Sequence, residues 1–78
     1  MDDRQILGHI SELVDEEKRL RSGHAGLSDV ERSRLRDLEA QLDQAWDLLR
    51  QRRAREDTGE DPEQAHERPR DEVESYLQ

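Results

Sequence analysis

The stretch LEAQLDQAWDLLRQRRA, residues 38–54, decides the fold of this chain. Three of its leucines and one alanine recur at alternating steps of three and four residues. One more leucine, three residues before the stretch, continues the pattern. The positions are Leu35, Leu38, Leu42, Ala45 and Leu49. Such steps return side chains to one stripe of a helix, which is typical of a coiled-coil-like packing seam. We predict one long helix over about residues 28–55.

A second helix is predicted upstream, over about residues 3–21. Its apolar stripe consists of Ile6, Ile10, Leu13 and Leu20. The connecting segment SGHAGLS contains two glycines, which favour a helix stop, and Ser28 with Glu31 then forms a capping box. Because so short a connection makes neighbouring helices antiparallel, we expect residues 1–56 to form an all-α, two-helix hairpin.

Matching the two stripes gives an expected register between the helices. The expected pairs are Leu13 with Leu35, Ile10 with Leu38, and Ile6 with Leu42. In this register the second helix extends beyond the first by about two turns of ~3.6 residues. Trp46, Leu48 and Leu49 are therefore expected at an overhang, without a partner from the first helix.

The last part of the chain, residues 57–78, reads as an acidic linker followed by a short helix. It has almost no apolar residues until Val73, Tyr76 and Leu77, which follow at helical spacing. A short helix of this kind needs a surface on which to dock. We expect it to fold back onto the apolar residues of the overhang.

Composition narrows the possible functions. The 78 residues allow one small domain, of which 29% are hydrophobic and 44% are charged. The net charge of −8 disfavours generic binding to nucleic acids and to anionic membranes. The sequence has no cysteine, which excludes disulfides and thiolate metal sites.

The sequence gives no signal for a membrane protein. No apolar run approaches the roughly 20 residues that a membrane-spanning helix needs. Met1 is followed by Asp2 and Asp3, unlike the basic start of a signal peptide. We expect a cytoplasmic protein without a membrane partner.

A basic block is the sharpest local feature, and it consists of Arg50, Arg52, Arg53 and Arg55. Guanidinium groups at this density could clamp phosphates or an acidic partner. The four side chains, however, point around the whole helix, and no aromatic residues lie between them for base stacking. We therefore favour a role in balancing the helix C-terminus and the acidic tail, and we do not expect nucleic acid as a partner.

No group of residues indicates catalysis, a cofactor or a metal centre. His9, Glu12 and Glu16 lie on neighbouring helical faces, and Glu63 with His66 forms one isolated Glu-x-x-His motif. A carboxylate-bridged metal site in a helical bundle uses two such motifs and two further glutamates. No serine is accompanied by a base and an orienting group, so we predict that the chain is not an enzyme.

Three segments carry a resemblance to a known family: ILGHISELVDEE (6–17), LDQAWDLLRQRRA (42–54) and VESYLQ (73–78). Together they resemble a small, mostly actinobacterial family that is catalogued only as a domain of unknown function. The resemblance implies a cytoplasmic helical protein. It implies no reaction, ligand or partner.

The functional prediction is a non-enzymatic helical interaction module. We expect it to self-associate, as a dimer that forms a four-helix bundle, or to bind a helical protein partner. The alternative is a small factor associated with nucleic acid or ribonucleoprotein that uses the basic block. The candidate interaction residues are Trp46, Leu48, Leu49, Arg50, Arg52, Arg53, Arg55, Val73, Tyr76 and Leu77.

Overall fold

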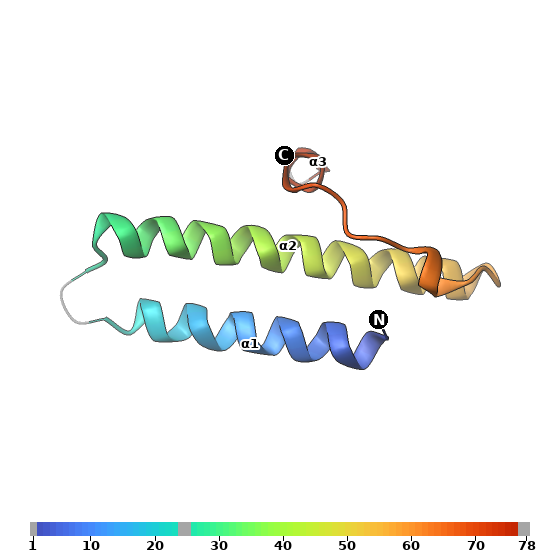
Figure 1. Cartoon of the computed structure of the whole chain (residues 1–78), viewed down its shortest axis with the longest axis horizontal. Helices are drawn as coiled ribbons and strands as arrows, with labels where there is room; N and C mark the ends of the chain where they lie inside the picture. The colour runs from blue at the N-terminus through green and yellow to red at the C-terminus, as the bar shows by residue number, and fades with distance from the viewer. Residues whose placement is uncertain (1, 24–25, 77–78) are drawn as a thin grey trace.

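Two long antiparallel helices form the body of the protein in the computed structural model, which describes residues 2–23 and 26–76 (Figure 1). Helix α1 spans Asp3–Arg21 and α2 spans Asp29–Asp57. A single 3-10 turn, η1 (Pro62–Gln64), and a short helix, α3 (Arg70–Tyr76), follow. The predicted all-α hairpin is confirmed, and the described residues contain no strand.

Capping boxes fix where both long helices begin. At the start of α2 the Glu31 backbone N–H donates to Ser28 Oγ at 3.1 Å, and the Ser28 N–H donates to Glu31 Oε1 at 3.0 Å. This is the predicted box. Asp2 and Gln5 form an equivalent box for α1, with distances of 2.8 and 2.9 Å. Each box satisfies backbone donors that the first helical turn leaves without a partner.

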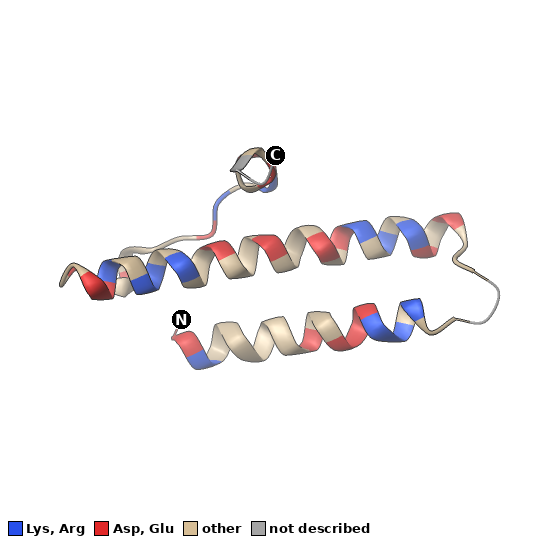
Figure 2. Cartoon of the chain, turned by 180° about the vertical axis from the view of Figure 1, so that it is seen from behind, with Lys and Arg blue, Asp and Glu red and all other residues tan. Residues whose placement is uncertain are grey.

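Helix α2 is the central element, since α1 lies along one side of it and the C-terminal part of the chain along another (Figure 1). The main apolar cluster lies between α1 and the C-terminal half of α2, and it consists of Ile6, Ile10, Ala45 and Leu49. Seen from behind in Figure 2, the part of α1 that faces this half of α2 is mostly uncharged, whereas α2 carries charges along its whole length. The uncharged part of α1 therefore supplies the core.

The register of the hairpin differs from the expected one. Arg52 of α2 contacts Asp3 at the start of α1, at 2.6 Å, and the cluster of Ile6 and Ile10 includes Leu49. These contacts correspond to a shift of seven residues, or about two turns at ~3.6 residues per turn. The expected pairing of Ile6 with Leu42 is therefore wrong. A seven-residue shift keeps every stripe on the same face, and the observed register buries Ala45 and Leu49 as well.

The expected overhang is wrong for the same reason. Leu49 is only 1% exposed and belongs to the core, and Leu48 is half-buried against the same cluster. Both residues thus have partners from α1. Of the three residues assigned to the overhang, only Trp46 keeps a large exposed fraction, 41%.

The C-terminal segment, residues 60–76, folds back along α2 as predicted, but at a different place (Figure 1). The Gln51 amide donates to the His66 carbonyl oxygen at 2.8 Å, and the Gln44 amide donates to the Arg68 carbonyl oxygen at 3.2 Å. The segment therefore runs from the C-terminal end of α2 to its middle, and α3 docks near Asp37, which Arg70 contacts at 3.2 Å. Val73 is buried there; the side chain of Tyr76 and all of Leu77 lie outside the described part.

A polar stripe on α2 explains this placement. Its members follow steps of three and four residues: Asp37, Ala40, Gln44, Asp47 and Gln51. Ala40 and Asp47 are buried, and the amides of the stripe bind backbone carbonyl groups of the C-terminal segment. The segment thus docks mainly by satisfying polar groups.

Candidate interaction site

The basic block does not form one surface, because Arg52 is an internal residue. Its side chain is 7% exposed and donates to Asp3 Oδ1 at 2.6 Å, to the Pro62 carbonyl oxygen at 3.3 Å and to Glu63 Oε1 at 3.2 Å. The hydrogen bond to Asp3 raises the pKa of Arg52 above its usual value, so the guanidinium stays charged. Arg52 therefore joins α1, α2 and η1, and it is not available to an outside partner.

The other three arginines differ among themselves. Arg55 pairs with Glu60 at 2.9 Å, just beyond the end of α2. Arg50 and Arg53 are exposed, and within the described part of the chain their side chains form no ion pair. Only these two residues of the block are free to contact another molecule.

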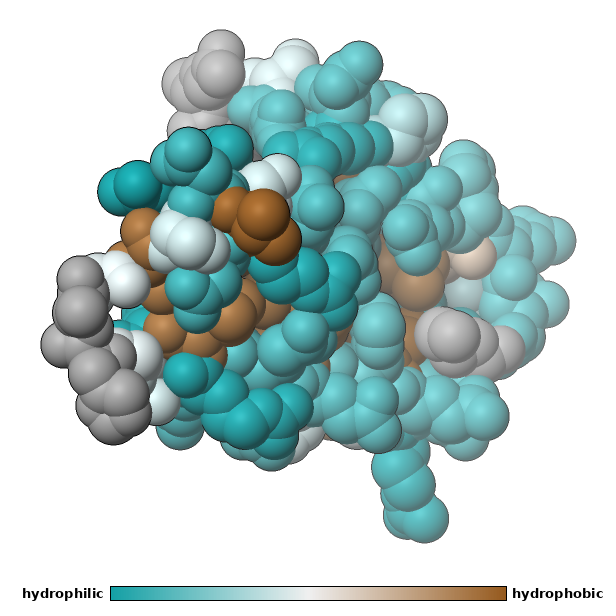
Figure 3. Space-filling model, turned by 60° about the vertical axis from the view of Figure 1, so that its left-hand side comes forward, coloured by the Kyte–Doolittle hydropathy of each residue, from teal (hydrophilic) through white to brown (hydrophobic). Residues whose placement is uncertain are grey.

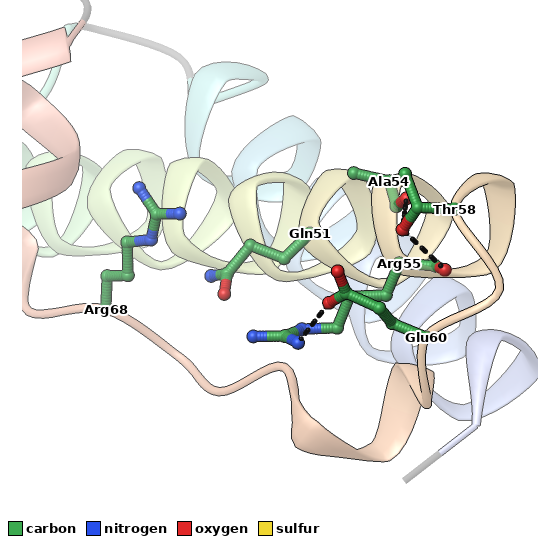
Figure 4. Close-up of a pocket in the computed structure, with 6 residues that line it drawn as sticks. All are labelled: Gln51, Ala54, Arg55, Thr58, Glu60 and Arg68. Atoms are coloured by element: carbon green, nitrogen blue, oxygen red, sulfur yellow. Dashed lines mark hydrogen bonds and ion pairs between the residues drawn. The ribbon is translucent and has the colours of Figure 1, made fainter.

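A shallow hollow of about 300 Å³ lies beside Arg55, and Figure 4 shows the six side chains around it. Arg55 binds Glu60 there, and Thr58 Oγ1 donates to the backbone carbonyl groups of Ala54 and Arg55. The other two polar side chains at the rim, Gln51 and Arg68, both bind Asp47. The hollow offers no set of converging groups for a ligand.

The ion pairs between the long helices identify the two edges of the hairpin. On one edge, Arg21 of α1 contacts Glu39 of α2 at 2.9 Å. On the other, Arg34 of α2 donates two hydrogen bonds of 2.9 Å to Glu16 of α1. Neighbouring positions on each edge follow at intervals of seven residues, because two helical turns return a side chain to nearly the same direction.

The first of these edges, which we call the Trp46 edge, contains several apolar residues between charged ones. Seven-residue steps from Arg21 lead to Val14 and Leu7, and the same steps from Glu39 lead to Trp46 and Arg53. Its members are Leu7, Val14 and Arg21 of α1 and Glu39, Trp46 and Arg53 of α2.

Exposure distinguishes the Trp46 edge from the core. Leu7 is 42% exposed and Trp46 is 41% exposed, while Val14 is half-buried against the core cluster. In Figure 3, which faces the connecting end of the hairpin, apolar atoms in brown also reach the surface between hydrophilic side chains. One large apolar residue at that end, Val30, is 78% exposed on its own at the start of α2. The Trp46 edge differs from it in combining several apolar residues in one row.

The sequence had identified only part of this site. Trp46, Arg50 and Arg53 were expected at an interaction surface, and they lie on or beside the Trp46 edge. Leu7 and Val14 were missed, although their seven-residue spacing is visible in the sequence. The signal was hidden because both lie beside a stronger stripe of isoleucine and leucine.

Among residues 2–23 and 26–76, no three His, Asp or Glu side chains are arranged to hold a metal ion. Within the same ranges, no helix is both long and apolar enough to cross a bilayer.

These features define a class: a small all-α protein whose long central helix packs against one helix and against its own folded-back C-terminal segment. The chain belongs to the family described as "Protein of unknown function (DUF2630)", whose model matches residues 2–78. The resemblance seen in the sequence is thereby confirmed.

Mycobacterial relatives are similar over nearly the whole chain. The uncharacterized proteins Mb0922c of Mycobacterium bovis and Rv0898c of Mycobacterium tuberculosis are each 53% identical over 78 residues. Each alignment covers 96% of this chain and 90% of the relative. No solved structure matches the chain. These descriptions assign no activity to the relatives.

Proposed function

We propose that this chain is a non-enzymatic, cytoplasmic interaction module that self-associates through the Trp46 edge. The observation that carries the proposal is the exposure of Leu7 and Trp46, 42% and 41%, in one row between the two long helices. A tryptophan flanked by aliphatic residues and arginine is the composition found at the centre of protein interfaces.

The arrangement of the C-terminal segment supports the choice of this edge. Gln44, Asp47 and Gln51 are already bound by that segment, so the polar stripe of α2 is covered within the chain. The core face of α2 is covered by α1. Within the described part of the chain, Leu7 and Trp46 of the Trp46 edge stay exposed, and Arg50 and Arg53 beside it form no ion pair.

Self-association also suits the small size of the core. Nine apolar residues are buried among the described ones, and four of them form the main cluster. Two-helix units of this size gain stability when a second unit buries their remaining apolar surface, as in four-helix bundles. Burying the exposed parts of Leu7 and Trp46 would stabilise a dimer by about 25 cal/mol for each Å² of apolar surface removed from water.

Light scattering on the purified chain tests the proposal. We expect the wild-type protein to have about twice its monomer mass of 9.2 kDa at micromolar concentration. Trp46→Ala should shift it toward the monomer, because the largest exposed apolar side chain of the edge is removed. Val30→Ala is the matched control, since Val30 is 78% exposed but lies outside the edge. A fully helical wild-type monomer across this range would contradict self-association.

A second candidate function, nucleic-acid binding, has one observation in its favour: Arg50 and Arg53 are exposed side by side on α2. Two free guanidinium groups on a chain of net charge −8 favour at most weak, salt-sensitive binding. Sub-micromolar binding of a labelled RNA or DNA near physiological salt, lost in the double variant Arg50→Gln and Arg53→Gln, would favour this alternative over self-association.

A further inference from the structure

The charges beside the Trp46 edge follow an order along α2. Arg50 and Arg53 follow Trp46 toward the C-terminal end, and Asp43 and Glu39 precede it. Arg53 and Glu39 lie seven residues from Trp46 in opposite directions, each about 10 Å along the helix at ~1.5 Å per residue. The charges nearest to Trp46 on the exposed side of α2 are thus basic toward the C-terminal end and acidic toward the N-terminal end, and farther toward the N-terminal end Arg32 and Arg36 are basic again.

We propose that the Trp46 edge is closed by a second copy of the chain, related by a two-fold axis that runs at right angles to the long helices and passes between the two copies at the level of Trp46. This inference rests on the proposed self-association and specifies its geometry. In a two-fold interface each contact occurs twice, so residue i meets j of the other copy and j meets i. Arg53 of each copy then lies opposite Glu39 of the other, and the two α2 helices run antiparallel.

The nearer charges agree with the same axis. Arg50 lies four residues after Trp46 and Asp43 three residues before it, so the rotation brings them together to within about one residue's rise of ~1.5 Å. Neither side chain forms an ion pair inside its own chain, as far as the described residues extend. Both are therefore available to a second copy, which makes the surface self-complementary.

Helix α1 supplies apolar residues at the same level. Asp3 contacts Arg52, so Trp46, six residues earlier on α2, lies at about the level of residue 9 on α1. Leu7 and Val14 lie on either side of that level, along the same edge. The centre of the proposed interface is therefore apolar, and its charged pairs lie toward the rim, as in most protein interfaces.

The other two-fold arrangement, with the axis along the helices, is disfavoured by charge. Arg4 lies one turn before Leu7, at the same end of the hairpin as Arg50 and Arg53. An axis along the helices would gather these three arginines from both copies at one end. Like charges juxtaposed across an interface disfavour association, whereas the perpendicular axis pairs opposite charges.

A charge-reversal pair tests this geometry in the full chain. In Arg50→Glu, position 50 and Asp43 of the other copy are both acidic; in Asp43→Arg, both are basic, and neither change removes an ion pair within the described part of the chain. We expect each variant alone to dimerise at least about tenfold more weakly than the wild type, because the unfavourable contact occurs twice. Mixing the two variants should restore dimers, since every pair in the mixed dimer is then of opposite charge. Arg19→Glu is the matched control, because it makes the same change of charge at an exposed position of α1.

The outcomes separate the geometry from the proposed function. Weak dimers from each variant alone and restored dimers in the mixture, measured by analytical ultracentrifugation, support the perpendicular axis. A wild-type dimer with no restoration on mixing, or with single variants no weaker than the wild type, overturns this geometry and leaves self-association standing. A wild-type monomer at all concentrations overturns both.

Discussion

Arg52 donates a hydrogen bond of 2.6 Å to Asp3, a residue 49 positions away in the chain. The same guanidinium binds the Pro62 carbonyl oxygen and the Glu63 carboxylate in η1. One side chain therefore fixes the register of the hairpin and the point at which the C-terminal segment turns back. A buried cation with several acceptors costs stability when its partners are removed, so this group has little tolerance for change.

Replacing Arg52 by glutamine should consequently lower the melting temperature by several degrees. The acceptors at Asp3 and Glu63 lose their charged donor, and glutamine cannot reach both. Arg19→Gln is the matched control, because Arg19 is exposed, lies outside the Trp46 edge and forms no ion pair within the described residues. Thermal melting followed by circular dichroism compares the two variants at equal protein concentration. Equal melting temperatures would show that the Arg52 contacts make no net contribution to the stability of the fold.

The core position of Leu49 gives a second prediction. Leu49 is 1% exposed and packs with Ile6, Ile10 and Ala45. Leu49→Ala should lower the free energy of unfolding by about 2–5 kcal/mol, because apolar contact is lost and a cavity remains. Val30→Ala should change it by less than about 0.5 kcal/mol, as usual for an exposed site. Urea unfolding measures both; a small effect at Leu49 would favour the register in which it lies at an overhang.

Helix positions could be predicted because their signals are local. The Ser28–Glu31 box and the glycines before it placed the start of α2, which the structure has at Asp29. The end at Asp57 lies two residues beyond the expected one, since Thr58 and not the last arginine caps the helix. Signals that depend on neighbouring residues in the chain are thus read reliably from sequence.

Register and docking could not be predicted, because they depend on comparing distant alternatives. A shift of seven residues leaves the leucine stripe facing α1, so the pattern alone cannot distinguish the two registers. The ion pair between Asp3 and Arg52 is what distinguishes them. Gln44 and Gln51 carry no local signal for docking, because their amides bind backbone carbonyl groups that lie 24 and 15 residues away in the chain.

The capping box of α2 predicts how stability changes in acid. Glu31 accepts a hydrogen bond from the Ser28 backbone N–H, and this bond holds the pKa of Glu31 below its usual value of 4.5. The folded chain thus takes up this proton at a lower pH than the unfolded chain. The stabilisation is therefore complete above about pH 4.5 and is lost as the pH falls through the folded pKa.

Glu31→Gln isolates that contribution, because glutamine also completes a capping box but does not titrate. Thermal melts at a series of pH values should show a smaller loss of stability in acid for the variant than for the wild type. If the two proteins lose stability equally as the pH falls, the Glu31 carboxylate contributes nothing measurable to the pH dependence of stability.

The docking of α3 gives the last prediction, which uses Val73. This side chain is 1% exposed, whereas the stripe of α2 beneath the C-terminal segment is polar apart from Ala40. Val73→Asp would bury a carboxylate at an apolar position. Because burying a charge costs free energy, α3 should detach while α1 and α2 stay paired. Ser75→Asp places the same charge at an exposed position of α3 and serves as the control.

Hydrogen exchange followed by mass spectrometry distinguishes the two variants. Residues 60–76 should lose protection in Val73→Asp but not in Ser75→Asp, and residues 3–21 should keep theirs in both. Trp46 emission should hardly change, because the Trp46 edge and the polar stripe lie on different sides of α2. A red shift of Trp46 emission on detachment would instead place the C-terminal segment over the tryptophan, and would remove the Trp46 edge as an open interaction surface.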